Sequence, residues 1–226
     1  MNFEEGEVLL INKPLTWTSF DVVNKVRYAL KRKTGKRLKV GHAGTLDPLA
    51  TGLLLICTGK MTKQIESYTG MDKEYTGTFI LGATTPSYDS EHAVDATFPI
   101  EHITQELLAE AVKGLSGTIQ QMPPKFSAIK VDGVVAYNAA RQGEEIVLKA
   151  RQVHIPEFEL TRVELPEIDF RVKCSKGTYI RSLAHDFGKA LNSGAYLKTL
   201  CRTKVGEFSL AEAHSLEDML KKIEES

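Results

Sequence analysis

Residues 41–52 read GHAGTLDPLATG, a segment in which one carboxylate, Asp47, stands among small and neutral residues. This isolation has two interpretations. In the first, Pro48 restricts Asp47 to extended backbone angles, and the Asp47 side chain caps a short turn by accepting the amide of Ala50. In the second, the glycines let a flat or phosphorylated ligand approach the backbone, and the neutral surroundings partly desolvate one reactive carboxylate. The two are compatible, because a cap also orients a catalytic acid.

A second segment, CSKGTYIRSLAHD at residues 174–186, combines a predicted helix start with a basic side chain. An alternating strand ends before the turn Lys176-Gly177, and a helix over Thr178–Leu191 carries Tyr179 and Arg181 in its first turn. A helix N-terminus favours an anion, so an arginine there can complete a pocket for a carboxylate or a phosphate. The alternative is an exposed helix charge beside a tyrosine that packs.

Length and composition indicate an ordinary soluble globular protein. The chain has 226 residues, with 42% hydrophobic and 26% charged residues, and no run approaches the roughly 20 apolar residues of a membrane span. The acidic start, MNFEEGEVLLINKP, is unlike a secretory signal, so we expect a cytoplasmic protein. The three cysteines are far apart and odd in number, which fits neither disulfides nor a metal clasp. The histidine spacing predicts no metal site, and residues 52–62 depart from the nucleotide-binding P-loop.

The net charge is zero, but the basic residues are clustered. Between Val22 and Leu46 there are eight basic residues and no acidic one. A local basic surface attracts phosphates although the protein is neutral overall, because screening ends the attraction within about 8 to 10 Å. The alternative is a solvated helix end. The residues predicted to contact an RNA backbone are Lys31, Arg32, Lys33, Lys36, Arg37 and Lys39.

Coarse secondary structure predicts an α+β fold with a mixed, mainly antiparallel sheet and flanking helices. A helix capped by Thr18 or Ser19 has Phe20, Val23 and Leu30 on its apolar side. The other predicted elements are strands at 7–12, 53–57, 75–81, 127–131, two across 145–165, 168–174 and 204–208, and helices at 107–115, 135–142 and 215 onward. Residues 211–226 are predicted to form a short C-terminal helix.

These segments together resemble the bacterial tRNA pseudouridine-55 synthase family. The resemblance runs in family order from LINKP at 10–14 through GHAGTLDPLATGLL, DKEY at 72–75, SAIK at 127–130 and CSKGTYIRSL to LCR at 200–202. It implies a single pseudouridine synthase-like catalytic domain over residues 1–226, with 211–226 as a short C-terminal helix and no appended RNA-binding domain. It implies the isomerisation of uridine to pseudouridine at position 55 in the T-loop of tRNA. It also implies a nucleotide flipped out of the RNA, and neither a metal nor another cofactor.

The resemblance assigns roles residue by residue. Asp47 matches the single essential aspartate, Tyr75 the aromatic residue that stacks on the target base, and Arg181 the arginine that pairs with the aspartate. The residues implied to line or support the substrate pocket are His42, Tyr179, Leu200, Lys13, Gly44 and Lys176. The implied partner is the T-arm and elbow of tRNA. We expect a monomer that does not bind a membrane.

Two departures and two alternatives accompany this interpretation. The Lys-Pro motif is commonly followed by glycine, whereas this chain has Leu15-Thr16-Trp17, and His92 stands where glycine is frequent. A folding chaperone that binds tRNA, with modification as a side activity, is one alternative. A hydrolase of a small substrate is the other, and it has no second acid, histidine or metal motif in its favour.

Overall fold

The structure is a computed structural model that describes residues 1–127, 129–131, 134–137, 142 and 147–226. Backbone contacts divide the chain into two compact units, of which the first comprises Met1–Thr76 and Leu200–Ser226 and the second Gly77–Thr199. Strands β4 (Lys73–Leu81) and β13 (Ala195–Val205) each contribute residues to both units. Within the described residues, no helix combines the length and the apolar composition needed to cross a membrane.

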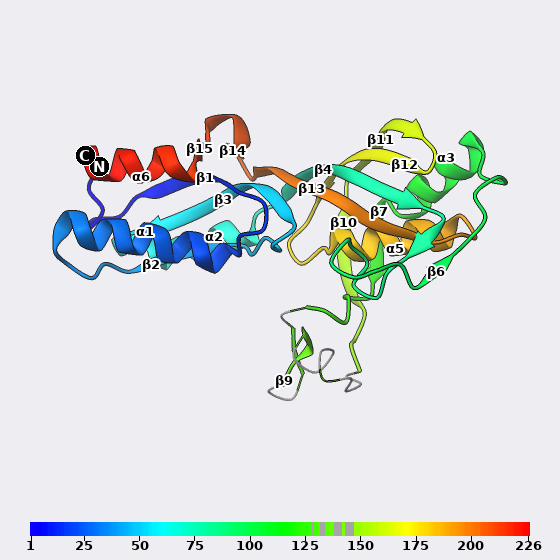
Figure 1. Cartoon of the computed structure of the whole chain (residues 1–226), viewed down its shortest axis with the longest axis horizontal. Helices are drawn as coiled ribbons and strands as arrows, with labels where there is room; N and C mark the ends of the chain where they lie inside the picture. The colour runs from blue at the N-terminus through cyan, green and yellow to red at the C-terminus, as the bar shows by residue number, and fades with distance from the viewer. Residues whose placement is uncertain (128, 132–133, 138–141, 143–146) are drawn as a thin grey trace. The chain divides into compact units, whose positions relative to one another are not determined.

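The first unit is built on β3 (Ala50–Thr58), which is buried almost throughout. Strand β3 pairs antiparallel with β1 (Val8–Lys13) and β2 (Val40–Ala43), and parallel with β13. The bounds of its other elements are η1 (Gly59–Gln64), α2 (Ile65–Gly70), β14 (Phe208–Ser209), η2 (Leu210–Glu212) and β15 (His214–Ser215). Helices α1 (Ser19–Thr34) and α6 (Leu216–Glu225) contact each other, while α6 also contacts β1 and α1 contacts β2 (Figure 1).

Helix α1 begins at a capping box, because Thr18 Oγ1 accepts the Asp21 amide and the Asp21 carboxylate accepts the Thr18 amide at 2.9 Å. Its buried face is formed by Ser19, Val22, Val23, Val26, Ala29 and Leu30. The prediction that Phe20 belongs to this face was wrong, since Phe20 is 59% exposed. At 3.6 residues per turn, Phe20 lies about a third of a turn from the centre of the face, next to Arg27.

The second unit contains an antiparallel pair, β11 (Glu157–Glu164) with β12 (Glu167–Cys174), followed in the sheet by β4 and β13. Ile168, Phe170, Val172 and Cys174 are all buried, as their alternation predicted. The remaining elements are β5 (Ala83–Thr84), β6 (Ala96–Thr97), α3 (Gln105–Gly114), β7 (Gly117–Gln121), β8 (Lys130–Val131), β9 (Val134–Val135), β10 (Arg151–Ile155) and α5 (Ile180–Ala190).

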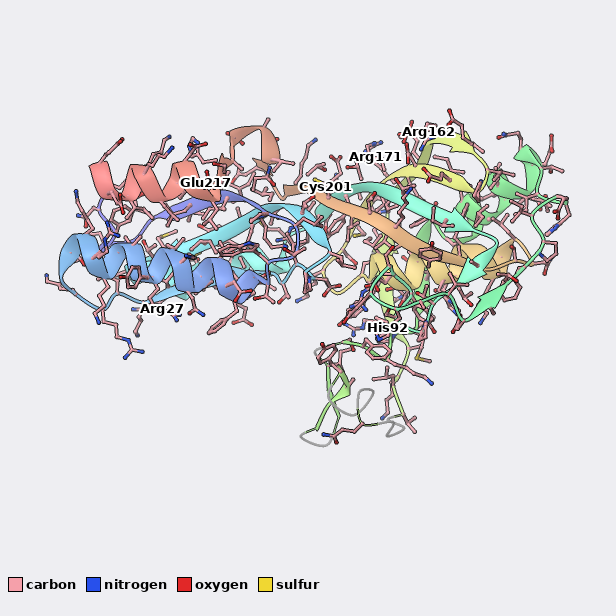
Figure 2. All side chains as sticks on the ribbon, in the orientation of Figure 1. Arg27, His92, Arg162, Arg171, Cys201 and Glu217 are labelled. Carbon is pink, nitrogen blue, oxygen red and sulfur yellow. The ribbon has the colours of Figure 1, made fainter. Side chains whose placement is uncertain are left out.

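Charged side chains crosslink the hairpin β11–β12. Arg162 lies 2.7 Å from Asp169, and Arg171 lies 2.8 Å from Glu157 (Figure 2). These ion pairs raise the pKa of both guanidinium groups, with hydrogen bonds to the carboxylates as the main cause. The network stabilises a hairpin whose opposite face is buried.

The α+β class with a mixed, mainly antiparallel sheet is confirmed, with two parallel pairs, β1 with β15 and β13 with β3. Strand β13 is much longer than the predicted strand at 204–208, because Lys198, Thr199 and Lys204 interrupt any apolar alternation. Helix α5 begins at Ile180 with Tyr179 as its N-cap, rather than at Thr178. Of the predicted turn 132–133 and helix 135–142, residues 132–133 and 138–141 lie outside the described residues. The single catalytic domain stays a prediction.

Candidate active site

The loop between β2 and β3 carries Asp47 and belongs wholly to the first unit. Its turn is closed by the main chain, because the Ala50 amide donates to the Asp47 carbonyl oxygen at 3.0 Å. The main chain therefore closes this turn, and the capping role of the Asp47 side chain stays a prediction. Asp47 is half-buried, whereas Leu46, just before it, is 3% exposed and anchors the loop in the core.

Four hydrogen bonds to Leu46 and Pro48 fix the loop. Ser19 Oγ donates to the Leu46 carbonyl at 3.1 Å and accepts the Leu46 amide at 2.8 Å. The Thr16 amide donates to the Pro48 carbonyl at 2.8 Å, and Lys13 Nζ lies 3.4 Å from the same oxygen. The segment around Asp47 is thus held on both sides before any ligand binds, which is the preorganisation that a catalytic group requires.

Lys13 is a buried cation with no exposed surface. Its ammonium donates to the carbonyl oxygens of Pro14 at 2.9 Å and Trp17 at 2.5 Å. Burial lowers the pKa of Lys13 to about 8, and the negative charge of Asp47 opposes that shift. The support role that the sequence implied for Lys13 therefore has a specific form: it joins the turn at 14–17 to the loop that carries Asp47.

Arg202 is a second buried cation, 1% exposed, and sequence reasoning gave it no role. Its Nε donates to the Leu53 carbonyl at 2.8 Å, and its Nη2 donates to the Gly44 carbonyl at 3.1 Å. Gly52 pairs with Arg202 in the parallel register and has a φ of 101°. A Cβ atom added at Gly52 would lie 2.3 Å from the Arg202 carbonyl oxygen. The sequence did contain a signal for Arg202, because Gly52 and Arg202 both lie in segments that match the family. Their pairing in the parallel register of β3 and β13 explains why the two residues occur together.

The other predicted residues of the first unit lie on neighbouring strands. His42 is on β2, Tyr75 on β4 and Leu200 on β13, beside Ala50 in the parallel register. Burial lowers the pKa of His42, as does the nearby charge of Arg202. Tyr75 is 9% exposed. Gly44 has a φ of 84°, and its carbonyl is the Arg202 acceptor described above.

In the second unit, the start of helix α5 is tied to β7. The Gln121 side chain, fully buried, accepts the Tyr179 amide at 2.8 Å and donates to the Tyr179 carbonyl at 3.1 Å. The Arg151 guanidinium lies 4.9 Å from the centre of the Tyr179 ring, within cation–π range. Lys176 is exposed in the preceding turn. Tyr179, which the sequence placed in the first helical turn, is therefore the N-cap of α5, and its backbone is fixed by Gln121.

Arg181 is buried, at 6% exposure, which excludes the interpretation of an exposed helix charge. Its Nη1 donates to the Phe126 carbonyl at 3.0 Å and the Ser87 carbonyl at 3.3 Å. Its Nε lies 3.6 Å from Oδ2 of Asp89, which is also buried. The other Asp89 oxygen accepts Ser87 Oγ at 2.6 Å. Asp89 is a second residue that sequence reasoning left without a role.

The predicted site residues are thus divided between the units. Lys13, His42, Gly44, Asp47, Tyr75 and Leu200 belong to the first, and Lys176, Tyr179 and Arg181 belong to the second. The ion pair between Asp47 and Arg181 stays a prediction. Among the described residues, no cluster of three or more histidine, cysteine or acidic side chains has the geometry to hold a metal ion.

Comparison with known proteins finds two family models that together match residues 31–226. The profile of the TruB family pseudouridylate synthase (N terminal domain) matches residues 31–180, and that of the tRNA pseudouridylate synthase B C-terminal domain matches residues 181–226. The chain is 63% identical over 211 residues to tRNA pseudouridine synthase B of Flavobacterium johnsoniae, covering 92% of each chain. It is 60% identical over 218 residues to the protein of the same name from Phocaeicola vulgatus, covering 96% of this chain and 93% of the relative.

Two solved structures are also similar. One is a Cbf5-Nop10-Gar1 complex, with a TM-score of 0.74 and 27% identity over 98% of this chain. The other is an H/ACA RNP bound to a substrate RNA containing 2'-deoxyuridine, with a TM-score of 0.70 and 25% identity over 97% of this chain. The chain spans 55% and 53% of those two solved chains.

The class that this fold and these matches define is the pseudouridine synthases, which are isomerases. Within that class, the chain belongs to the TruB family.

Proposed function

We infer that this chain isomerises uridine to pseudouridine at position 55 in the T-loop of tRNA, with Asp47 as its one catalytic carboxylate. The observation that carries the proposal is the half-buried Asp47, fixed between hydrogen-bonded neighbours and near the fully buried ammonium of Lys13. The relatives at 63% and 60% identity bear the name tRNA pseudouridine synthase B, which supports tRNA as the substrate.

The reaction breaks the bond between N1 of uracil and C1′ of the ribose, turns the base and joins C5 to C1′. An ionised Asp47 serves it either by attacking C1′ or by removing a proton from C2′. The bond made between C5 and C1′ replaces the one broken at N1, and C5 loses a proton while N1 takes one up, so the reaction needs no redox partner. In this proposal Asp47 touches the reacting atoms, and Arg181 is its charge partner when the substrate is bound.

The target uridine has to leave the RNA stack before Asp47 reaches it. Unstacking costs a few kcal/mol, and stacking on an aromatic ring returns about 1 to 3 kcal/mol. We assign that stacking to Tyr75, and the lining of the nucleotide pocket to His42, Leu200 and Tyr179. The Gly44 backbone and Lys176 complete the proposed pocket.

Contacts within the first unit divide five of the six proposed RNA-binding residues into two groups. Arg32 lies 2.8 Å from Glu224, Lys33 donates to the Glu224 carbonyl at 2.8 Å, and Lys36 lies 2.7 Å from Glu4. Arg37 and Lys39 instead line a surface cavity of about 570 Å³ together with Arg27 of α1, which Figure 2 labels. A cavity with three cationic side chains suits an RNA phosphate, so we assign the larger share of backbone binding to this group.

Charge reversal separates the two groups. Arg37→Glu and Lys39→Glu are each expected to reduce the slope of log affinity against log salt by about 1, because each phosphate contact contributes about 0.7 to 0.9. Lys36→Glu, the matched control, is expected to change that slope less, since Lys36 already faces Glu4. Equal slopes for the wild type and both cavity variants would contradict the assignment.

The decisive test of the function is incubation of the protein with unmodified tRNA transcript, followed by mapping of pseudouridine along the RNA. We expect conversion at position 55 of the T-loop and no conversion by Asp47→Asn. Folded protein that leaves position 55 unconverted would refute the proposal. An Asp47→Asn variant that binds tRNA and restores function in cells would favour the chaperone alternative, and turnover without RNA would favour the hydrolase.

A further inference from the structure

A second surface cavity in the first unit has no place in the site described above. It encloses about 420 Å³ and is lined by Thr16, Trp17, Asp21, Asn24 and Lys25. This volume lies within the range of about 300 to 1,000 Å³ that holds small organic groups. Trp17 is the one tryptophan of the chain, and it is only half-buried. An indole face that lines an accessible cavity is available for stacking.

The wall of this cavity is joined to the loop that carries Asp47. The Thr16 amide donates to the carbonyl of Pro48, the residue after Asp47, at 2.8 Å. Lys13 Nζ donates to the Trp17 carbonyl at 2.5 Å and lies 3.4 Å from the Pro48 carbonyl. Thr16 has a φ of 70°, a conformation that costs a threonine of order 1 kcal/mol or more. The hydrogen bonds of Thr16 and Lys13 hold the turn of Trp17 in this conformation beside the loop that carries Asp47.

The cavity lining favours a base over a phosphate. Lys25 Nζ lies over the Trp17 ring, 5.9 Å from its centre, so a base that stacks on this face displaces the ammonium toward the phosphate of its own nucleotide. The Asp21 carboxylate accepts the Thr18 amide at 2.9 Å and the Thr18 hydroxyl at 2.6 Å. These hydrogen bonds lower the pKa of Asp21, so the group is an anion at neutral pH. An anion in the lining repels a phosphate but accepts the N–H groups of a nucleobase edge.

We propose that this cavity binds an unpaired nucleobase of the RNA substrate other than the target uridine, stacked on Trp17, with Lys25 against the phosphate of the same nucleotide. The proposal rests on the proposed function, because it takes RNA as the substrate. The hydrogen bonds through Thr16 and Lys13 join the cavity wall to the loop that carries Asp47, so this base and the target uridine bind to adjoining parts of the first unit. The cavity would then fix the register of the RNA at the active site.

Tryptophan fluorescence tests the stacking directly, since every change in tryptophan emission comes from Trp17. Titration with unmodified tRNA transcript is expected to quench the emission saturably, and free N-acetyltryptophanamide in the same RNA corrects for absorption by the nucleic acid. Unchanged emission at RNA concentrations that saturate binding, measured independently by filter retention, would overturn the proposal.

Steady-state kinetics provide the second test. Trp17→Ala is expected to raise KM about tenfold with little change in kcat, whereas Trp17→Phe, which retains a ring, recovers most of the loss. Tyr28→Ala is the matched control, since Tyr28 is a 64% exposed aromatic residue of α1 outside the cavity lining. A KM for Trp17→Ala equal to that of Tyr28→Ala would refute the stacking role. Wild-type protein that converts no uridine would refute the proposed function instead, so the two failures are distinguishable.

Discussion

The two units solve the burial of positive charge in different ways. In the first, Lys13 and Arg202 are bound by neutral carbonyl oxygens, from Pro14 and Trp17 for the lysine and from Gly44 and Leu53 for the arginine. In the second, Arg181 faces a buried carboxylate, Asp89, at 3.6 Å. Carbonyl oxygens satisfy hydrogen bonds without cancelling charge, whereas a carboxylate cancels it.

This difference explains the electrostatics of each neighbourhood. Burial lowers the pKa of Lys13 to about 8, because carbonyl dipoles replace its hydration only in part, and the acids that oppose this shift are Asp47 and Asp21. In the first unit the buried ammonium of Lys13 therefore interacts with the loop that carries Asp47. In the second unit Asp89 holds the Arg181 guanidinium in place. Four predictions test this comparison.

The largest effect is expected at Asp47. Asp47→Asn is expected to lower the rate of pseudouridine formation at least about 10³-fold, since an amide neither attacks C1′ nor removes a proton. The free energy of unfolding should change little, because the main chain closes the Asp47 turn. Single-turnover assays and urea denaturation measure the two quantities. A large loss of stability with the rate retained would show that Asp47 is structural.

Removal of the carboxylate from the second neighbourhood should destabilise the protein. Asp89→Asn is expected to reduce the free energy of unfolding by about 3 to 5 kcal/mol, because it leaves the buried Arg181 without its anion. Urea denaturation measures this change. Asp95→Asn is the control, since it removes an exposed carboxylate of the same segment, one that accepts the Thr84 hydroxyl at 2.6 Å. Equal effects of the two substitutions would contradict the compensation of Arg181 by Asp89.

The first neighbourhood predicts a dependence of stability on alkaline pH. The pKa of Lys13 is about 8 in the folded protein, below its ordinary value of 10.5, so between these pH values the unfolded chain binds more protons. The free energy of unfolding should therefore rise with pH across this window, by about 3 kcal/mol from Lys13 alone. Denaturation of wild type and Lys13→Met at several pH values isolates the contribution. Parallel pH profiles for the two proteins would contradict it.

The smallest effect concerns the turn before helix α1. Thr16 adopts a φ of 70°, the conformation that glycine takes without steric cost. Thr16→Gly is expected to raise the free energy of unfolding by up to about 1 kcal/mol, with the entropy of the unfolded glycine offsetting part of the gain. Thermal denaturation measures it, with Thr45→Gly, at an exposed position of the catalytic loop, as the control. A destabilised Thr16→Gly would show that the threonine side chain has a role of its own in the cavity.

The sequence alone was sufficient for the elements with a strong local pattern. The alternation of Ile168, Phe170, Val172 and Cys174 identified β12, and Ser215 identified the start of α6, because side-chain period and cap chemistry are local properties. Helix α1 was found through its cap, but Phe20 was misplaced because two neighbouring faces of that helix both carry apolar residues. The motif around Asp47 indicated the family, which the comparisons then showed.

Only the tertiary structure decided which charged residues are internal. Lys13, Asp89, Arg181 and Arg202 look like ordinary surface residues in the sequence, yet each is at most 6% exposed. Their burial depends on acceptors far away in the chain: Lys13 uses Pro48, Arg202 uses Gly44 and Leu53, and Arg181 uses Ser87 and Phe126. Local sequence determines the elements because propensity and periodicity act over a few residues. The folded backbone determines which charges can be buried, because it supplies the oxygen atoms that replace their water.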